Sequence, residues 1–245
     1  MENIVIPIQS RVRQPYQYKT KVIKYIISVI SIIAIVVSGV FAYKAYQDYK
    51  IDKAINNLFV INAYSDKGEI KSIVKTIKKL PNKVQRTLLD NNIKIDYETW
   101  VINEIPNYKD LYTFDIAGVF DGAGSRIVLQ YEPNTGKKLI ERNILNVNSF
   151  HEIGHAFDYD YILKQNGYAY SGTIEFDDIY KEEAPKIFSV SNFNYLRKDF
   201  GEYFIKDRME YFAECFGFYF ASDDTNKFLK ENAPKTYSYI KQITK

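Results

Sequence analysis

The chain has 245 residues, 46% hydrophobic and 26% charged, a composition typical of a globular protein of one or two domains. It contains no internal repeat, no low-complexity segment and no glycine-rich phosphate loop. The formal net charge is +3, but residues 1–24 hold five basic side chains against one acidic one, so the rest of the chain carries a net charge of about −1. This distribution does not indicate a nucleic-acid-binding body.

The basic segment 1–24 is followed by a run of 19 residues, 25–43, that carries no charge. The run is long enough to span a bilayer, and the basic residues before it predict that the N-terminus stays inside the cell. We expect an uncleaved signal anchor, although Val40-Phe41-Ala42 offers the small residues of a cleavable signal peptide. Both alternatives export the rest of the chain. It is therefore expected outside the cell, anchored to the membrane or, after cleavage, secreted.

Residues 44–64 mix charged and apolar side chains in the pattern of a helical stalk, and residues 65–245 are expected to form the main domain. A helical stripe of apolar residues over 69–80 ends at Pro81. Asn82 is expected to cap a second short helix.

Residues 93–97 alternate as in a strand, and residues 115–130 read as a hairpin around a turn at 121–124. A helical patch follows over 175–188, in which Glu182-Glu183 is expected to face solvent. Residues 208–220 carry apolar side chains nearly all round, which predicts a buried helix.

The only two histidines, His151 and His155, lie in the motif His-Glu-Ile-Gly-His. Residues four apart on a helix share one face, so both imidazoles can hold the same metal ion. Glu152 lies close enough to take a proton from a water on that ion, which is the chemistry of metal-assisted peptide hydrolysis. The alternative is a chance match on a surface helix.

Zinc bound in this way needs a third protein ligand, and no histidine remains. Glu210 and Glu214 lie one turn apart inside the apolar segment 208–220, where unpaired carboxylates are rare. Glu210 is the better candidate for the third ligand, while Cys215 lies on another face. Glu214 is then placed to accept the free N–H of a ligating imidazole.

Three further residues have weaker assignments. Asp158, seven residues after His151, is a second candidate to support the metal ligands. Cys215 is the only cysteine, which excludes an intramolecular disulfide, and we expect it in the core rather than as a nucleophile. Tyr203, seven residues before Glu210, could donate to the oxyanion that develops during hydrolysis.

Together these segments resemble the catalytic domain shared by anthrax lethal factor and the clostridial Pro-Pro endopeptidases. The resemblance runs from about residue 65 to the C-terminus and is carried by Tyr203 and by the segments 151–158, 179–183, 210–214 and 232–237. It implies an α+β, zincin-like fold with a small sheet, an active-site helix and a mainly helical C-terminal half.

The resemblance also implies roles for individual residues. His151, His155 and Glu210 would bind one Zn²⁺, and Glu152 would be the general base. Tyr203 would stabilise the oxyanion, and Glu214 would support the metal ligands. The strand on which substrate lies would map near residues 118–130.

We therefore expect a monomeric zinc metalloendopeptidase of the gluzincin type that cleaves extracellular protein substrates. Two features depart from the family. The spacing of 55 residues from His155 to Glu210 is longer than we expect, and the cell-entry and substrate-docking domains of lethal factor have no counterpart. One alternative is a catalytically silent zinc-binding surface module, against which Glu152 and Tyr203 argue. Another is a structural membrane protein with a chance motif, against which the pair Glu210 and Glu214 argues.

Overall fold

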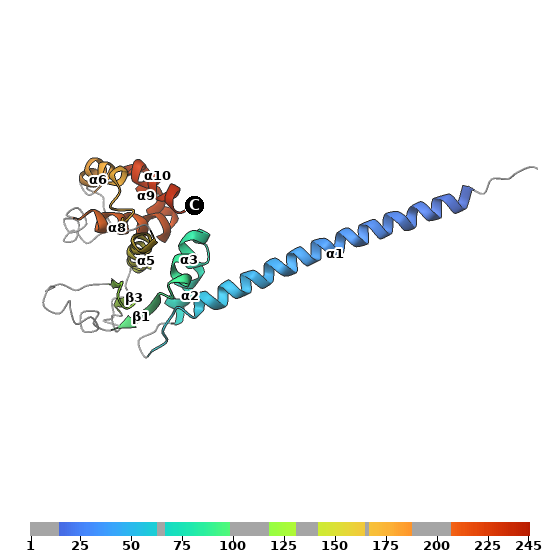
Figure 1. Cartoon of the computed structure of the whole chain (residues 1–245), viewed down its shortest axis with the longest axis horizontal. Helices are drawn as coiled ribbons and strands as arrows, with labels where there is room; N and C mark the ends of the chain where they lie inside the picture. Colours follow the sequence, from blue (N-terminus) through green and yellow to red (C-terminus); the bar gives the residue numbers. More distant parts are fainter. Residues whose placement is uncertain (1–14, 63–66, 99–117, 131–141, 165–166, 188–206) are drawn as a thin grey trace, which may run out of the picture. The chain divides into compact units, whose positions relative to one another are not determined.

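The structure is a computed structural model, and it describes residues 15–62, 67–98, 118–130, 142–164, 167–187 and 207–245 (Figure 1). The chain divides into two compact units, residues 1–50 and 51–245. Helix α1 (Pro15–Asn56) supplies the described part of the first unit, and its last residues belong to the second.

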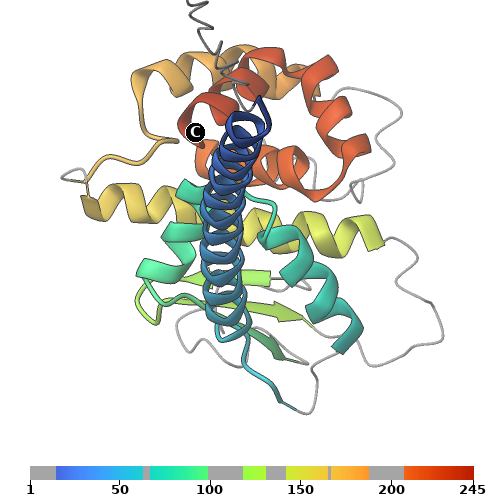
Figure 2. The ribbon, with the colours of Figure 1, turned by 90° about the vertical axis from the view of Figure 1, so that its right-hand side faces the viewer.

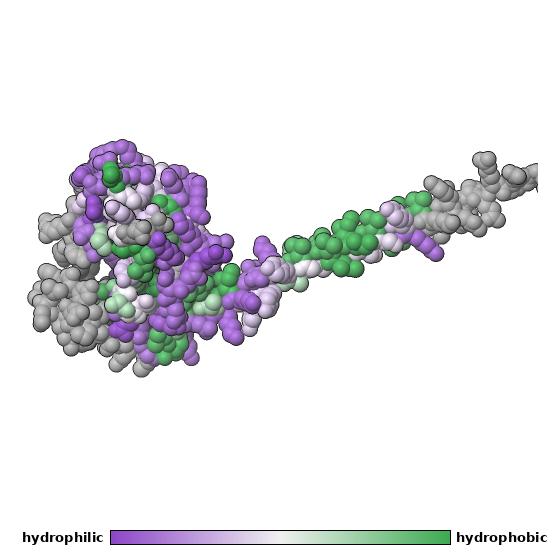
Figure 3. All heavy atoms as spheres, viewed as in Figure 1, coloured by the Kyte–Doolittle hydropathy of each residue, from purple (hydrophilic) through white to green (hydrophobic). Residues whose placement is uncertain are grey.

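In the first unit, helix α1 carries the charge-free run predicted to span a membrane. It is the one helix in the described parts of the chain that is long and apolar enough to do so. The apolar side chains gather in a band along its length and are exposed (Figure 3). Tyr25 and Tyr43 border this band, and tyrosines at both ends are typical of helices that cross a bilayer.

In the second unit, helix α5 (Arg142–Lys164) runs through the middle (Figure 2). Its sequence contains the motif at 151–155. Helix α3 (Asn82–Asp90) and a small sheet pack on one side of α5, and helix α8 (Arg208–Ala221) packs on the other. The other helices of this unit are α2 (Lys67–Ile77), α6 (Ile174–Ile187), α9 (Asp223–Asn232) and α10 (Pro234–Ile243).

The sheet consists of β1 (Lys94–Glu98), β2 (Gly118–Asp121) and β3 (Arg126–Gln130), in the order β1-β3-β2. Strands β2 and β3 form the predicted hairpin, with Val119 opposite Val128. Strand β3 runs parallel to β1. Among the described residues, β2 is therefore an edge strand, and it lies against α5.

The hydrophobic core fills both sides of α5. Towards the C-terminal helices, Phe150 and Phe157 of α5 are buried with Phe212 and Phe216 of α8. On the other side, the core contains apolar side chains of α2, α3 and the sheet, among them Ile77, Val84, Leu88, Ile95 and Ile127. An α+β architecture with a small sheet and a mostly helical C-terminal half is thus present.

Two predictions of detail are wrong. Asn82 does not cap α3, because Pro81 is the N-cap residue and its carbonyl accepts the N–H groups of Val84 and Gln85. Glu183 does not face solvent: it is 3% exposed and its carboxylate accepts the backbone N–H groups of Lys235 and Thr236 at the start of α10. Adjacent helix positions point about 100° apart, so Glu182 can remain outside while Glu183 turns inwards.

Candidate active site

The site lies where α5 crosses α8, and glycines allow the two helices to approach closely. A Cβ atom on Gly154 of α5 would lie 3.0 Å from the Cα of Ala213. A Cβ on Gly217 of α8 would lie 2.8 Å from the carbonyl oxygen of Val147. Both contacts are with backbone, which cannot give way easily. Sequence reasoning missed these two positions, although a glycine inside a helix costs about 1 kcal/mol and often marks close packing.

Three side chains converge at this crossing. His151 and His155 come from α5, and Glu210 comes from the first turn of α8, whose N-cap Asp207 accepts the N–H of Met209 at 2.7 Å. One ligand atom from each of the three lies within 4.8 Å of the other two. The imidazole Nε2 atoms are 3.1 Å apart, and Oε2 of Glu210 is 3.3 Å from that of His151. Two imidazole nitrogens and one carboxylate oxygen are ligands that zinc prefers, so the cluster can hold a metal ion.

Glu214 lies one turn after Glu210 and contacts the far side of the His151 ring. Its Oε2 is 3.0 Å from Nδ1 of His151, and the carboxylate is buried. With a hydrogen on Nδ1 donated to this carboxylate, Nε2 of His151 faces His155 and Glu210. The other carboxylate oxygen, Oε1, has no hydrogen-bond partner among the described residues.

Glu152 points from α5 towards the sheet rather than towards α8. It is 6% exposed, and its carboxylate accepts a backbone hydrogen bond from Phe120 of β2. A Cβ on Gly118 would lie 3.0 Å from both Cγ and Oε1 of Glu152. The carboxylate therefore lies directly against the edge strand, beside the cluster but outside it.

Burial and the neighbouring charges set the protonation of these groups. Burial raises the pKa of Glu152, and the positive charge of the two imidazoles only partly opposes this. Burial alone would lower the pKa of His151, but hydrogen bonds from its ring to the carboxylates of Glu210 and Glu214 outweigh burial and hold that pKa well above its usual value. For Glu210, burial would raise the pKa, but hydrogen bonds and charge from the two histidines lower it.

The remaining candidates lie elsewhere. Asp158 accepts the backbone N–H and the hydroxyl of Ser171 and so ties the chain at Ser171 to α5. Cys215 is buried and hydrogen-bonds with Tyr211, and burial raises the pKa of its thiol well above the usual range, so it is a core residue. Tyr203 lies outside the described residues.

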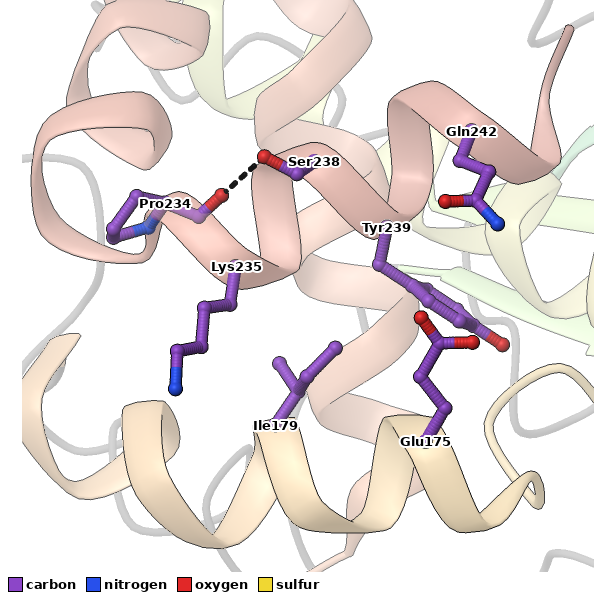
Figure 4. A pocket seen from close by; sticks show the side chains of 7 residues that line it. All are labelled: Glu175, Ile179, Pro234, Lys235, Ser238, Tyr239 and Gln242. Carbon is purple, nitrogen blue, oxygen red and sulfur yellow. Dashed lines mark hydrogen bonds between the residues drawn. The ribbon is translucent and has the colours of Figure 1, made fainter.

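A groove of about 500 Å³ lies away from the cluster, between α6 and α10 (Figure 4). Most of its polar side chains form hydrogen bonds or ion pairs with neighbouring residues. Lys235 pairs with Glu182, and the hydroxyl of Tyr239 donates to the carbonyl of Tyr170 at 2.9 Å. None of the cluster residues lines this groove.

Comparison with known proteins identifies the family. Residues 45–243 match the family model described as anthrax toxin lethal factor, N- and C-terminal domain, and the chain belongs to this family. A curated relative, Pro-Pro endopeptidase of Clostridioides difficile (strain 630), is 28% identical over 194 residues, which cover 74% of this chain and 78% of the relative. The resemblance predicted from the sequence is confirmed.

A solved structure supports the same fold. The Pro-Pro endopeptidase PPEP-2 from Paenibacillus alvei matches with a TM-score of 0.53 at 21% sequence identity, covering 78% of this chain and 99% of that one. The fold of the second unit, a small sheet with helices, is therefore that of a known peptidase.

Proposed function

We propose that the protein is a zinc-dependent endopeptidase with a zincin-like active site, in which His151, His155 and Glu210 bind the ion. One observation carries the proposal: the three ligand atoms converge within 4.8 Å, and Glu152 of the same helix lies buried beside them. A zinc ion bound there would lower the pKa of a coordinated water and polarise the scissile carbonyl.

Three side chains have separate roles in the proposed hydrolysis. Glu152 takes the proton of the attacking water and passes it to the leaving amine; burial raises the pKa of its carboxyl group, which is the direction that favours accepting a proton. Glu214 holds the ring of His151 in the tautomer that presents Nε2. Tyr203 is proposed as the donor to the oxyanion, by resemblance to the family.

The edge strand β2 supplies a place for an extended substrate. It is at the edge of the described sheet, and its Gly118 and Phe120 contact Glu152. A peptide added beside β2 would gain main-chain hydrogen bonds and pass next to the general base. Both relatives are Pro-Pro endopeptidases, which makes peptides with a Pro-Pro bond the first substrates to test.

Helix α1 is proposed as an uncleaved membrane anchor. It is long and apolar enough to cross a bilayer, and the basic segment 1–24 precedes the run. The excess of positive charge favours retention of that segment in the cytoplasm, which leaves the peptidase unit on the outer face. Its substrates would accordingly be extracellular proteins.

The proposal is tested on the full chain in detergent. About one equivalent of zinc should copurify, and His151→Ala or Glu210→Ala should lose it. The zinc-loaded protein should cleave members of a peptide library that includes Pro-Pro sequences, and a chelator should stop cleavage. Zinc without cleavage of any peptide would favour a silent binding module, and failure to bind zinc would reject the peptidase.

A further inference from the structure

Gly118 is the first residue of strand β2, and its backbone conformation does not require a glycine. Among the described glycines, Gly167 is the one with a positive φ, at 95°. A glycine in a strand weakens it, because the flexible backbone loses more entropy on folding and contributes no side chain to packing. Such a position often marks the close approach of another group. The atoms around position 118, rather than its backbone conformation, therefore explain why a glycine stands there.

That space is occupied by Glu152. A Cβ atom on Gly118 would lie 3.0 Å from Cγ and from Oε1 of Glu152, and 3.3 Å from its carboxyl carbon. All three of the nearest atoms belong to this one side chain. The carboxylate is buried and takes a backbone hydrogen bond from Phe120, so it can move aside only by giving up that contact.

A second set of contacts, with Tyr159 of α5, fixes the distance between the hairpin and this helix. Gly118 and Phe120 share one face of β2, because side chains alternate along a strand, and Gly122 in the following turn also faces α5. The ring of Phe120 packs edge-on against Tyr159 of α5, with centroids 5.7 Å apart. A Cβ on Gly122 would lie 3.1 Å from Cζ of the same tyrosine.

Helix α5 and the β2–β3 hairpin therefore contact each other at two points. Glu152 and Tyr159 are seven residues apart, two turns along one stripe of α5. Gly118 lies against Glu152, and Phe120 and Gly122 lie against Tyr159. With two contacts of this kind, the strand cannot shift away from Glu152 without also breaking the Tyr159 contacts.

We propose that Gly118 is a positioning residue for Glu152: its missing side chain makes room for the carboxylate against β2, where the amide of Phe120 holds it. Phe120 and Tyr159 keep the hairpin at the required distance. The functional meaning rests on the proposed role of Glu152 as general base. The packing relationship itself can be tested without any activity.

The test is a double-mutant cycle on the thermal midpoint of the full, metal-free chain in detergent. Gly118→Ala should lower the midpoint by roughly 3–6 °C, because the added methyl group overpacks against Glu152. In a Glu152→Ala background the same change should be neutral or stabilising, because alanine restricts the unfolded chain more than glycine does. An equal effect of Gly118→Ala in both backgrounds, including no effect, would overturn the proposal.

Gly122→Ala is the matched control, since it adds the same methyl group to the same face of the hairpin but meets Tyr159. Its effect on the midpoint should not depend on residue 152. In the zinc-loaded protein, Gly118→Ala should also lower kcat at least about 10-fold on a cleavable Pro-Pro peptide while zinc content stays unchanged. If the unmodified chain cleaves nothing, the proposed function fails, and the stability cycle still decides the role of Gly118.

Discussion

His151 and Glu214 are joined across the α5–α8 crossing by a 3.0 Å contact between Nδ1 and Oε2, and both side chains are buried. This contact favours the ring orientation in which Nε2 faces His155 and Glu210. The contact also explains why the Glu214 carboxylate is tolerated inside an otherwise apolar helix. The carboxylate is paired with the imidazole of His151, whose pKa is raised, despite burial, by its hydrogen bonds to Glu210 and Glu214.

Glu214→Gln keeps the shape of this side chain but removes its charge. We expect zinc affinity to fall by about 10- to 100-fold, because the ring of His151 loses the partner that orients it and raises its basicity. Competition with a chelator of known affinity measures the change. Glu231→Gln, on the exposed face of α9, is the control. Unaltered affinity in Glu214→Gln would show that this carboxylate does not support the site.

Gly217→Ala tests the close helix crossing. The new methyl group would lie 2.8 Å from the Val147 carbonyl oxygen and 3.3 Å from the backbone nitrogen of His151. We expect a net loss of about 1–2 kcal/mol in the free energy of unfolding, since overpacking outweighs the gain in helix propensity. Urea unfolding measures it. Gly172→Ala, whose nearest neighbour would be 3.4 Å away, should be tolerated; equal costs at both positions would contradict close crossing as the cause.

The pH dependence of zinc binding follows from His151. Its folded-state pKa is raised above the ordinary value of about 6.5, so in the metal-free protein its protonated form stabilises the fold below that pH. This stabilisation is lost as pH rises through the folded pKa. Zinc competes with the proton, so the rise in thermal midpoint on adding zinc should grow as pH rises from about 6.5 towards the folded pKa of His151. A zinc-induced shift that is constant over this range would contradict the coupling.

Glu183→Ala tests the start of α10. The Glu183 carboxylate accepts the N–H of Lys235, and the N–H and hydroxyl of Thr236, at 2.8–2.9 Å. Its removal takes the acceptor away from the partly buried N–H of Lys235 and the buried N–H of Thr236, and we expect a loss of about 2 kcal/mol or more in the free energy of unfolding. Glu182→Ala, which removes the exposed neighbour, should leave the unfolding midpoint nearly unchanged. Similar losses in both variants would argue against the capping role.

Local periodicity was sufficient to predict most elements of the fold. The hairpin β2–β3 and helices α3, α6 and α8 follow from turn residues and apolar spacing within each segment. The parallel pairing of β1 with β3 did not follow, because it joins residues about 30 positions apart and has no local signal. Glu183 was misassigned for the same reason: its partners lie more than 50 residues away in α10.

In the candidate site, too, contacts within one helix could be predicted from the sequence more readily than contacts between distant segments. The four-residue spacing of His151 and His155 already places them on one helix face. The convergence of Glu210 was expected only because a buried carboxylate needs a positive partner, and the structure brings it to the histidines. Their role as zinc ligands remains a prediction. The contact of Gly118 with Glu152 could not be foreseen, since it depends on how the hairpin packs against α5.

The most direct test of the account compares the zinc-loaded full chain with Glu152→Gln on one cleavable peptide. Glu152→Gln preserves the size of the side chain and should retain one zinc per chain, while kcat falls by at least about 100-fold because no carboxylate remains to take the proton. Cleavage at the normal rate by the zinc-loaded Glu152→Gln protein would contradict the assignment of Glu152 as the general base.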